Sequence, residues 1–112
     1  SMAVYDQDNV FAKILRGELP ARKIHEDVWA LAFYDHRPRE KVHALVIPKN
    51  AYVDYGDFIR SASSEEVIGF FRAVHQTVGV LGLEHFQLRC HTGIKSGQEV
   101  FHFHMHITSS GI

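Results

Sequence analysis

The sequence GQEVFHFHMHIT occupies residues 97–108 and places a histidine at every second position. These histidines are His102, His104 and His106. Successive side chains of a β-strand alternate between its two faces, so a strand here would direct all three imidazoles to one side. Phe103 and Met105 would face the other side, with Val100 and Ile107 extending that apolar register. Each buried imidazole needs a hydrogen-bond partner or water, so three on one face indicate a working site rather than ordinary packing.

Three aligned imidazoles are compatible with two chemistries. Neutral imidazole is a zinc ligand, but a rise of about 3.3 Å per residue puts neighbouring histidines roughly 6.6 Å apart, so one flat strand offers about two ligands to an ion. A third ligand would have to come from elsewhere, and His43 and His91 are available. In the other chemistry, the central imidazole attacks phosphorus while its neighbours hold the substrate's oxygens. The spacing alone leaves both chemistries open.

The length and composition favour an ordinary folded protein. The chain has 112 residues, so we expect one domain over residues 1–112. Hydrophobic residues make up 46% and charged residues 22%, which is typical of a globular protein. The formal net charge is −1 and no run of Lys or Arg occurs, so we expect no nucleic-acid polymer as partner. Ser1 before Met2 is interpreted as a residue left by expression cloning.

The only cysteine is Cys90, which excludes an intramolecular disulfide and favours a reducing compartment. It lies in an alternating apolar segment and is expected to be a buried, inert thiol. No stretch is long and apolar enough to span a membrane, and no signal-peptide pattern is present. These features predict a cytoplasmic protein that does not bind membranes.

Apolar periodicity predicts two helices. Residues 9–16 have apolar side chains at helical spacing, and Gly17 would end that short helix. A long helix is predicted to begin at Ser63 or Ser64 and to end near Leu81, and Ser63 with Glu66 fits a capping box. The apolar stripe of the long helix is interpreted as part of the core.

The remaining segments predict strands. Two short strands are expected within residues 24–34, where one register is apolar: Trp29, Leu31 and Phe33. Residues 43–47, HALVI, predict a buried strand, residues 86–90, FQLRC, predict a half-buried strand, and residues 50–58 resemble a loop. Because the strands follow one another without alternating helices, we expect an α+β fold. It would contain an antiparallel sheet of about five strands with one short and one long helix.

The sequence HFHMHIT, residues 102–108, resembles the histidine triad signature, in which histidines alternate with apolar residues. Three further blocks in the right order resemble the same family: NVFAKILRGELPARKIHED at 9–27, LAFYD at 31–35 and HALVIPK at 43–49. Together with GQEVFHFHMH at 97–106, they are similar to the HINT branch, the histidine triad nucleotide-binding proteins. The resemblance covers nearly the whole chain and implies a HIT-like fold.

The resemblance also implies an activity. The substrate would be a purine nucleoside 5′-phosphoramidate or a nucleotide ester, AMP-like or GMP-like, cleaved at the α-phosphorus without metal or cofactor. His104 would be the nucleophile and form a transient nucleotidyl-histidine. His106 would contact the phosphate or the leaving group and donate a proton, and His102 and His43 would orient the cluster. The family implies a homodimer as well.

The resemblance implies substrate contacts too. Asp35 would accept hydrogen bonds from ribose hydroxyls, although a solvated turn residue is the plainer interpretation. Phe11 and Ile14, which the residues alone would assign to the core, would form the wall of a base pocket. Gln98 and the backbone NH groups after it would bind phosphate oxygens, and Gly97 would let the backbone approach closely. The other substrate-binding residues would be Val10, Phe33, His36, His91, Glu99 and Val100.

Several positions depart from the family pattern. His91 stands where the branch usually has Asn, His36 replaces an apolar base contact, and Glu99 occupies a position that is Ser or Glu in members. The chain also ends soon after the triad. These departures keep a second hypothesis open, a nucleotide-binding regulatory module with weak or no turnover. A third is a zinc protein that uses His102 or His104 with His43 and His91.

Overall fold

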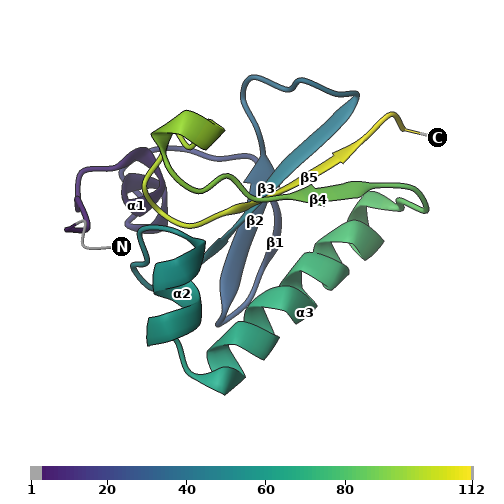
Figure 1. Cartoon of the computed structure of the whole chain (residues 1–112). Coiled ribbons are helices and arrows are strands. Elements are labelled where there is room, and N and C mark those ends of the chain that lie inside the picture. Colours follow the sequence, from purple (N-terminus) through teal and green to yellow (C-terminus); the bar gives the residue numbers. More distant parts are fainter. Residues whose placement is uncertain (1–3, 112) are drawn as a thin grey trace.

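The computed structural model describes residues 4–111, so the interpretation of Ser1 lies outside the described residues. Five strands form one antiparallel sheet in the order β1-β2-β3-β5-β4 (Figure 1). The strands are β1 (Lys23–Glu26), β2 (Ala30–Tyr34), β3 (Val42–Pro48), β4 (Gln87–Arg89) and β5 (Met105–Ser109). The predicted α+β fold with a five-stranded antiparallel sheet is therefore confirmed.

Strand β3 lies at the centre of the sheet and is buried on both faces. Ala44 and Val46 belong to one apolar cluster, and Leu45 and Ile47 belong to another. This division follows from strand geometry, because neighbouring side chains point to opposite faces. The sheet therefore separates two layers that differ in composition.

Three α-helices cover the sheet in the described part of the chain: α1 (Val10–Leu15), α2 (Tyr55–Ser61) and α3 (Ser64–Leu81). Phe58 of α2 and Phe70 of α3 pack on one face, whereas Phe11 of α1 packs on the other. Figure 1 shows the long α3 crossing the sheet, with α1 on the far side of the strands. The two faces are called the α3 face and the α1 face below.

The ends of the predicted helices agree with their capping residues. The Asn9 side chain accepts a hydrogen bond from the Ala12 N–H and starts α1. Ser63 does the same for the Glu66 N–H, and α3 ends at Gly82 in the left-handed conformation with φ 68°. Only half of the capping box forms, because the Glu66 carboxylate accepts a hydrogen bond from the Tyr52 hydroxyl instead.

Helix α2 was not expected, since residues 50–58 were interpreted as a loop. Asp54 begins the helix by accepting a hydrogen bond from the Asp57 N–H at 2.9 Å. The helix has seven residues and contains Gly56, so its periodic signal is too short to distinguish it from a turn.

The histidine stretch is not one strand, which corrects the sequence prediction. Strand β5 begins only at Met105, and residues 98–104 have irregular backbone. The alternation nevertheless continues through them, because Phe103 joins Met105 and Ile107 in the cluster on the α3 face. Val100 was assigned to that register, but it lies an even number of residues before His102 and His104, so the alternation puts it with them on the α1 face.

Two smaller predictions are also corrected. Trp29 precedes β2 and packs against α3, where a Cβ on Gly69 would lie 2.5 Å from the indole ring, so it does not share the register of Leu31 and Phe33. Strand β4 is exposed along its whole length rather than half-buried, because it is an edge strand. Cys90, just after it, is partly buried, and burial raises the pKa of its thiol.

Candidate functional site

A cavity of about 250 Å³ opens on the α1 face beside the histidines. Most of the sequence-predicted site residues line it: Val10, Phe11, Ile14, Phe33, Asp35, His36, His43, His91, Gly97, Glu99, Val100, His104 and His106. The same lining includes Arg37, Arg39 and Leu45, which the sequence analysis did not single out. The structure thus brings together residues from α1, three strands and the loop before β5.

One wall of the cavity is apolar. Val10, Phe11 and Ile14 come from the first turns of α1, and Phe33 comes from β2. The rings of Phe11 and Phe33 meet edge to face, with centroids 5.5 Å apart. Phe11 also meets the His104 ring edge to face at 4.9 Å. This wall can accommodate a flat aromatic group close to the imidazole.

His104 has a fixed tautomer. Its Nδ1 lies 2.7 Å from the backbone oxygen of His102. A carbonyl oxygen can only accept, so Nδ1 carries the hydrogen and Nε2 keeps its lone pair. Burial lowers the pKa of this imidazole, with only 7% of the residue exposed, and keeps it neutral. A neutral imidazole with a free lone pair on a cavity is a competent nucleophile.

His43 and His106 form a second fixed pair. The Arg39 backbone N–H donates to His43 Nδ1 at 3.1 Å, so His43 carries its hydrogen on Nε2. That hydrogen is donated to His106 Nδ1, 2.9 Å away, which leaves His106 with an N–H at Nε2. Burial, followed by the neighbouring His104 and His43, lowers the pKa of His106 to about 3. His106 can therefore present a donor where His104 presents a lone pair.

His102 does not reach the cavity, in contrast to its predicted place in a row of three working imidazoles. The residue is fully buried, and burial lowers its pKa to about 4. Its Nε2 donates to the Pro48 carbonyl at 2.9 Å, and its Nδ1 accepts from the Tyr5 hydroxyl at 2.6 Å. With both nitrogens bonded internally, His102 supports the site through its backbone carbonyl. Sequence reasoning missed Tyr5, which lies 97 positions away.

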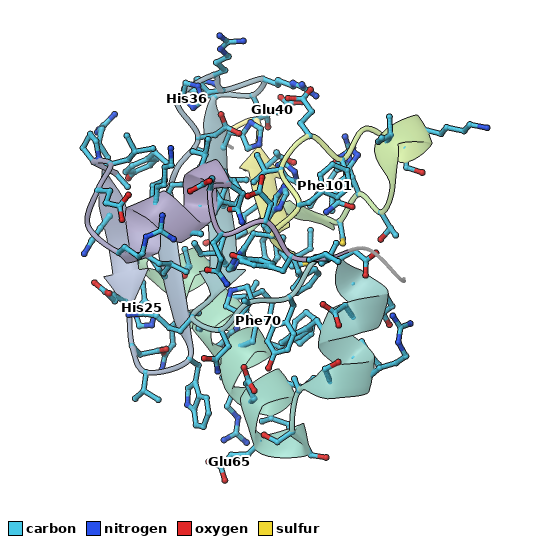
Figure 2. The ribbon with its side chains drawn as sticks, turned by 90° about the vertical axis from the view of Figure 1, so that its left-hand side faces the viewer. His25, His36, Glu40, Glu65, Phe70 and Phe101 are labelled. Carbon is cyan, nitrogen blue, oxygen red and sulfur yellow. The ribbon has the colours of Figure 1, made fainter. Side chains whose placement is uncertain are left out.

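Asp35 lies at the end of β2, where the strand leaves the sheet. Its Oδ1 accepts from the Arg37 backbone N–H at 2.7 Å, and its Oδ2 is 3.5 Å from His43 Nε2. The carboxylate thus faces the cavity with remaining acceptor capacity. His36, next in sequence, is exposed on the rim, and Figure 2 shows it at the end of the molecule opposite Glu65.

The loop before β5 forms the other side of the cavity. Gly97 has a φ of 93°, and a Cβ there would lie 3.2 Å from the His91 Nδ1. That nitrogen donates to the Ser96 carbonyl at 2.6 Å, and the His91 ring centroid is 5.1 Å from that of His106. Glu99 is exposed at the rim, 3.8 Å from the guanidinium of Arg39.

The position of Gln98 does not match its predicted role in phosphate binding. The residue is buried and does not line the cavity. Its amide nitrogen donates to the carbonyls of Val53 and Val100, and its amide oxygen accepts from the Gly93 N–H. All of these bonds are internal, so the side chain holds the loop rather than a ligand.

A zinc site fits the arrangement poorly. Among residues 4–111, the only group with metal-ligand atoms close together is Asp35, His43 and His106, which is not the set expected from the sequence. A metal on His43 Nε2 would move the ring hydrogen to Nδ1, where it would oppose the Arg39 N–H. His102 has no free nitrogen for an ion.

Comparisons with known proteins agree with this fold and site. The family model for the HIT domain matches residues 16–110, so the chain belongs to the HIT domain family. An uncharacterised HIT-like protein of Rickettsia prowazekii is 47% identical over 106 residues, covering 93% of this chain and 88% of the relative.

Solved structures of the family superpose closely. A HIT family hydrolase from Legionella pneumophila has a TM-score of 0.83 and 32% identity, covering 91% of this chain and 92% of its own. A HIT family hydrolase from Clostridium thermocellum has a TM-score of 0.81 and 28% identity, with coverage of 93% and 91%. The chain is thus a HIT-domain protein that shares its fold with hydrolases of that family. No helix among the described residues is both long and apolar enough to cross a membrane.

Proposed function

We propose that this protein is a metal-independent hydrolase that cleaves purine nucleoside 5′-phosphoramidates, or related nucleotidyl esters, at the α-phosphorus. One observation carries the proposal: His104 Nδ1 donates to the His102 carbonyl, which leaves the Nε2 lone pair free at a cavity. The resemblance to the HINT branch supplies the substrate class, and the hydrolases among the structural neighbours support the reaction type.

The chemistry takes two steps. First, His104 Nε2 attacks phosphorus, the bond from phosphorus to the amine nitrogen breaks, and that nitrogen gains a proton to leave as an amine. We assign delivery of the proton to His106, which lines the same cavity and whose ring centroid is 5.1 Å from that of His104. Water then attacks the nucleotidyl-histidine, returns a proton to His106 and releases the mononucleotide. An anionic phosphate would favour protonation of His106, although burial lowers the pKa of that ring. The hydrogen added at His106 Nδ1 would face the His43 Nε2–H, so His43 would then donate to Asp35 Oδ2, 3.5 Å away, instead.

The cavity has a place for each part of the substrate. The purine would lie against Phe11 and Ile14, and the ribose hydroxyls would donate to Asp35. The phosphate would lie between His104, His106 and the loop at Gly97, where backbone can approach closely. His91 would border the phosphate with its Nε2, because its Nδ1–H is donated to the Ser96 carbonyl.

A nucleotide-binding module with weak turnover is the second candidate. Its specific support is that only two of the three triad imidazoles, His104 and His106, reach the cavity. Binding without turnover would use the same apolar wall and the same carboxylate.

We further propose a homodimer formed through strand β4. This strand has one unpaired edge, and Phe86 just before it and Leu88 within it are 41% and 44% exposed. A second copy could extend the sheet there. Sedimentation of the intact chain tests this, and a monomer at micromolar concentration would contradict it. The cytoplasmic location also stays a prediction, supported by the single cysteine.

The deciding experiment measures release of amine and mononucleotide from adenosine 5′-phosphoramidate in the presence of a chelator. The intact chain is compared with His104→Ala and with His75→Ala, a matched change of an exposed histidine on α3. We expect chelator-resistant turnover that falls by about 10⁴-fold or more in His104→Ala and is unchanged in His75→Ala.

Other outcomes would decide against the proposal. Mononucleotide binding without turnover in the intact chain would favour the binding module. Turnover that the chelator abolishes would favour a metal site.

A further inference from the structure

Tyr5 lies outside the cavity but contacts the triad. Its hydroxyl oxygen is 2.6 Å from His102 Nδ1, and the two rings meet edge to face with centroids 5.6 Å apart. Tyr5 does not line the cavity, so it has no access to a substrate there. Tyr5 can therefore affect a reaction only through its contact with His102.

The direction of this hydrogen bond follows from the partners of His102. Its Nε2 faces the carbonyl of Pro48, which can only accept, so Nε2 carries the hydrogen. A neutral imidazole then has a lone pair at Nδ1, and the Tyr5 hydroxyl must be the donor. Burial raises the pKa of Tyr5, so the phenol keeps its hydrogen at neutral pH. His102 is fully enclosed, so water has no access to replace that donor.

The backbone of His102 connects this bond to the reacting imidazole. The His102 carbonyl accepts the Nδ1–H of His104 at 2.7 Å, and this contact determines which nitrogen of His104 is free. Residues 98–104 are outside any strand, and the peptide that carries this carbonyl is held by one backbone hydrogen bond, from the Phe103 N–H to the Tyr52 carbonyl at 2.7 Å. That bond holds the N–H of the peptide, and the two hydrogen bonds of the His102 ring, one to Pro48 and one to Tyr5, hold the residue that carries its carbonyl.

The segment that carries Tyr5 is itself held in place. The Asn9 side chain donates to the Asp6 carbonyl at 2.8 Å, and Arg16 donates to the Gln7 carbonyl at 2.7 Å. These contacts connect the segment to Asn9 and Arg16, the residues that cap helix α1 at its start and at its end. Tyr5 therefore reaches His102 from a defined position rather than from a free end.

We propose that Tyr5 is a positioning residue: its hydrogen bond to His102 acts together with the Pro48 and Tyr52 contacts to hold the carbonyl that orients His104 as the nucleophile. This inference rests on the proposed function. It assigns to the segment before α1 a part in the reaction that its distance in sequence from the triad does not suggest.

The test compares Tyr5→Phe with the intact chain. This change removes the hydroxyl but keeps the ring that packs on His102, so the fold should be retained. Tyr55→Phe is the matched control, because it removes the hydroxyl of an exposed tyrosine on α2. With adenosine 5′-phosphoramidate we expect Tyr5→Phe to lower kcat about tenfold and to change KM less than about twofold, and Tyr55→Phe to change neither.

A second readout separates positioning from stability. In protein labelled with ¹⁵N-histidine, His104 should show a slowly exchanging Nδ1–H, and Tyr5→Phe should shift this signal and speed its exchange. If Tyr5→Phe only lowers the melting temperature, with kcat and the His104 signal unchanged, the proposal is overturned. An unchanged protein in all three measurements would overturn it as well.

The two proposals fail in distinguishable ways. If the intact chain shows no turnover, the proposed hydrolase is wrong, while the His104 signal still decides whether Tyr5 orients that ring. If the intact chain turns over and Tyr5→Phe matches it in kcat and in the NMR signal, only the positioning role is wrong.

Discussion

The two faces of the sheet use the same strands for different purposes. On the α3 face, Phe103 stacks on Phe58 with centroids 4.7 Å apart and an angle of 18° between the rings. On the α1 face, the next residue, His104, borders the cavity and is held by a hydrogen bond. Two neighbouring residues thus belong to the apolar core and to the candidate site, respectively. The difference shows that alternation can be present before the regular strand begins at Met105.

The two faces also stabilise their buried side chains in different ways. The α3 face is stabilised by apolar burial, with Phe58, Phe70 and Phe103 fully or almost fully buried. The α1 face buries imidazoles, and each of them needs an internal partner. No buried side-chain nitrogen or oxygen in residues 4–111 lacks such a partner. Changes on the two faces should therefore affect different properties.

The largest expected effect on stability comes from Phe103→Ala. Removing this almost fully buried ring, 1% exposed, leaves a cavity between α2, α3 and the sheet. We expect the free energy of unfolding to fall by about 3–5 kcal/mol, measured by urea denaturation. His104→Ala is the comparison, with an expected loss of about 1 kcal/mol, because its ring borders an open cavity. Equal losses in the two variants would remove the distinction between the faces.

An acid-dependent loss of stability should come from the α1 face. Burial lowers the pKa of His102 to about 4, whereas the unfolded chain protonates this imidazole near pH 6.5. The unfolded state therefore binds more protons between these values, and stability is lost as the pH falls through that interval. Over that interval, protonation of His102 alone should lower the free energy of unfolding by about 3 kcal/mol.

Urea denaturation at several pH values measures this effect. The lowered pKa values of His104 and His106 act in the same direction and should steepen the dependence. The control variant His75→Gln, which removes an exposed imidazole on α3, should leave the pH dependence of the free energy of unfolding unchanged. A free energy of unfolding that stays constant from pH 7 to pH 5 would contradict a buried neutral His102.

The smallest expected effect concerns substrate selection by Asp35. The carboxylate is an acceptor-only group, and Asp35→Asn replaces one acceptor oxygen with a donor. We expect about a tenfold rise in KM for a ribonucleoside substrate and a much smaller rise for the 2′-deoxy substrate. Steady-state kinetics with both substrates measure the difference. Equal rises in KM for the two substrates would show that Asp35 does not distinguish ribose from 2′-deoxyribose.

Much of this organisation could be predicted from the sequence, because it depends on local patterns. The period of two placed His104 and Phe103 on opposite faces, and the capping residue Ser63 located the start of the long helix. The resemblance to the HINT branch, rather than a local pattern, assigned Asp35 and His43 to the site, and they line the same cavity as His104. A repeating pattern or a cap is a property of neighbouring residues and needs no knowledge of the fold.

The rest depends on contacts between distant residues. The Tyr5 hydroxyl meets His102 across 97 positions, and no pattern near Tyr5 indicates this. Arg39 acts through its backbone N–H, so its side chain carries no signal for the contact with His43. Gln98 was expected to bind a ligand, because the sequence does not show that its amide is held by the Val53 carbonyl from another part of the chain. Such roles become visible only once the segments are brought together.

The buried amide of Gln98 has a consequence for the dynamics of the cavity. It connects the 3₁₀ turn Ile94–Ser96, through Gly93, to the segment at Val53 before α2. Opening this loop would leave buried polar groups without partners, at a cost of about 1–3 kcal/mol for each. The side of the cavity at Gly97 should therefore open together with the α2 segment as one cooperative unit. A ligand would then meet a wall that is ordered before binding, with little conformational entropy left to lose.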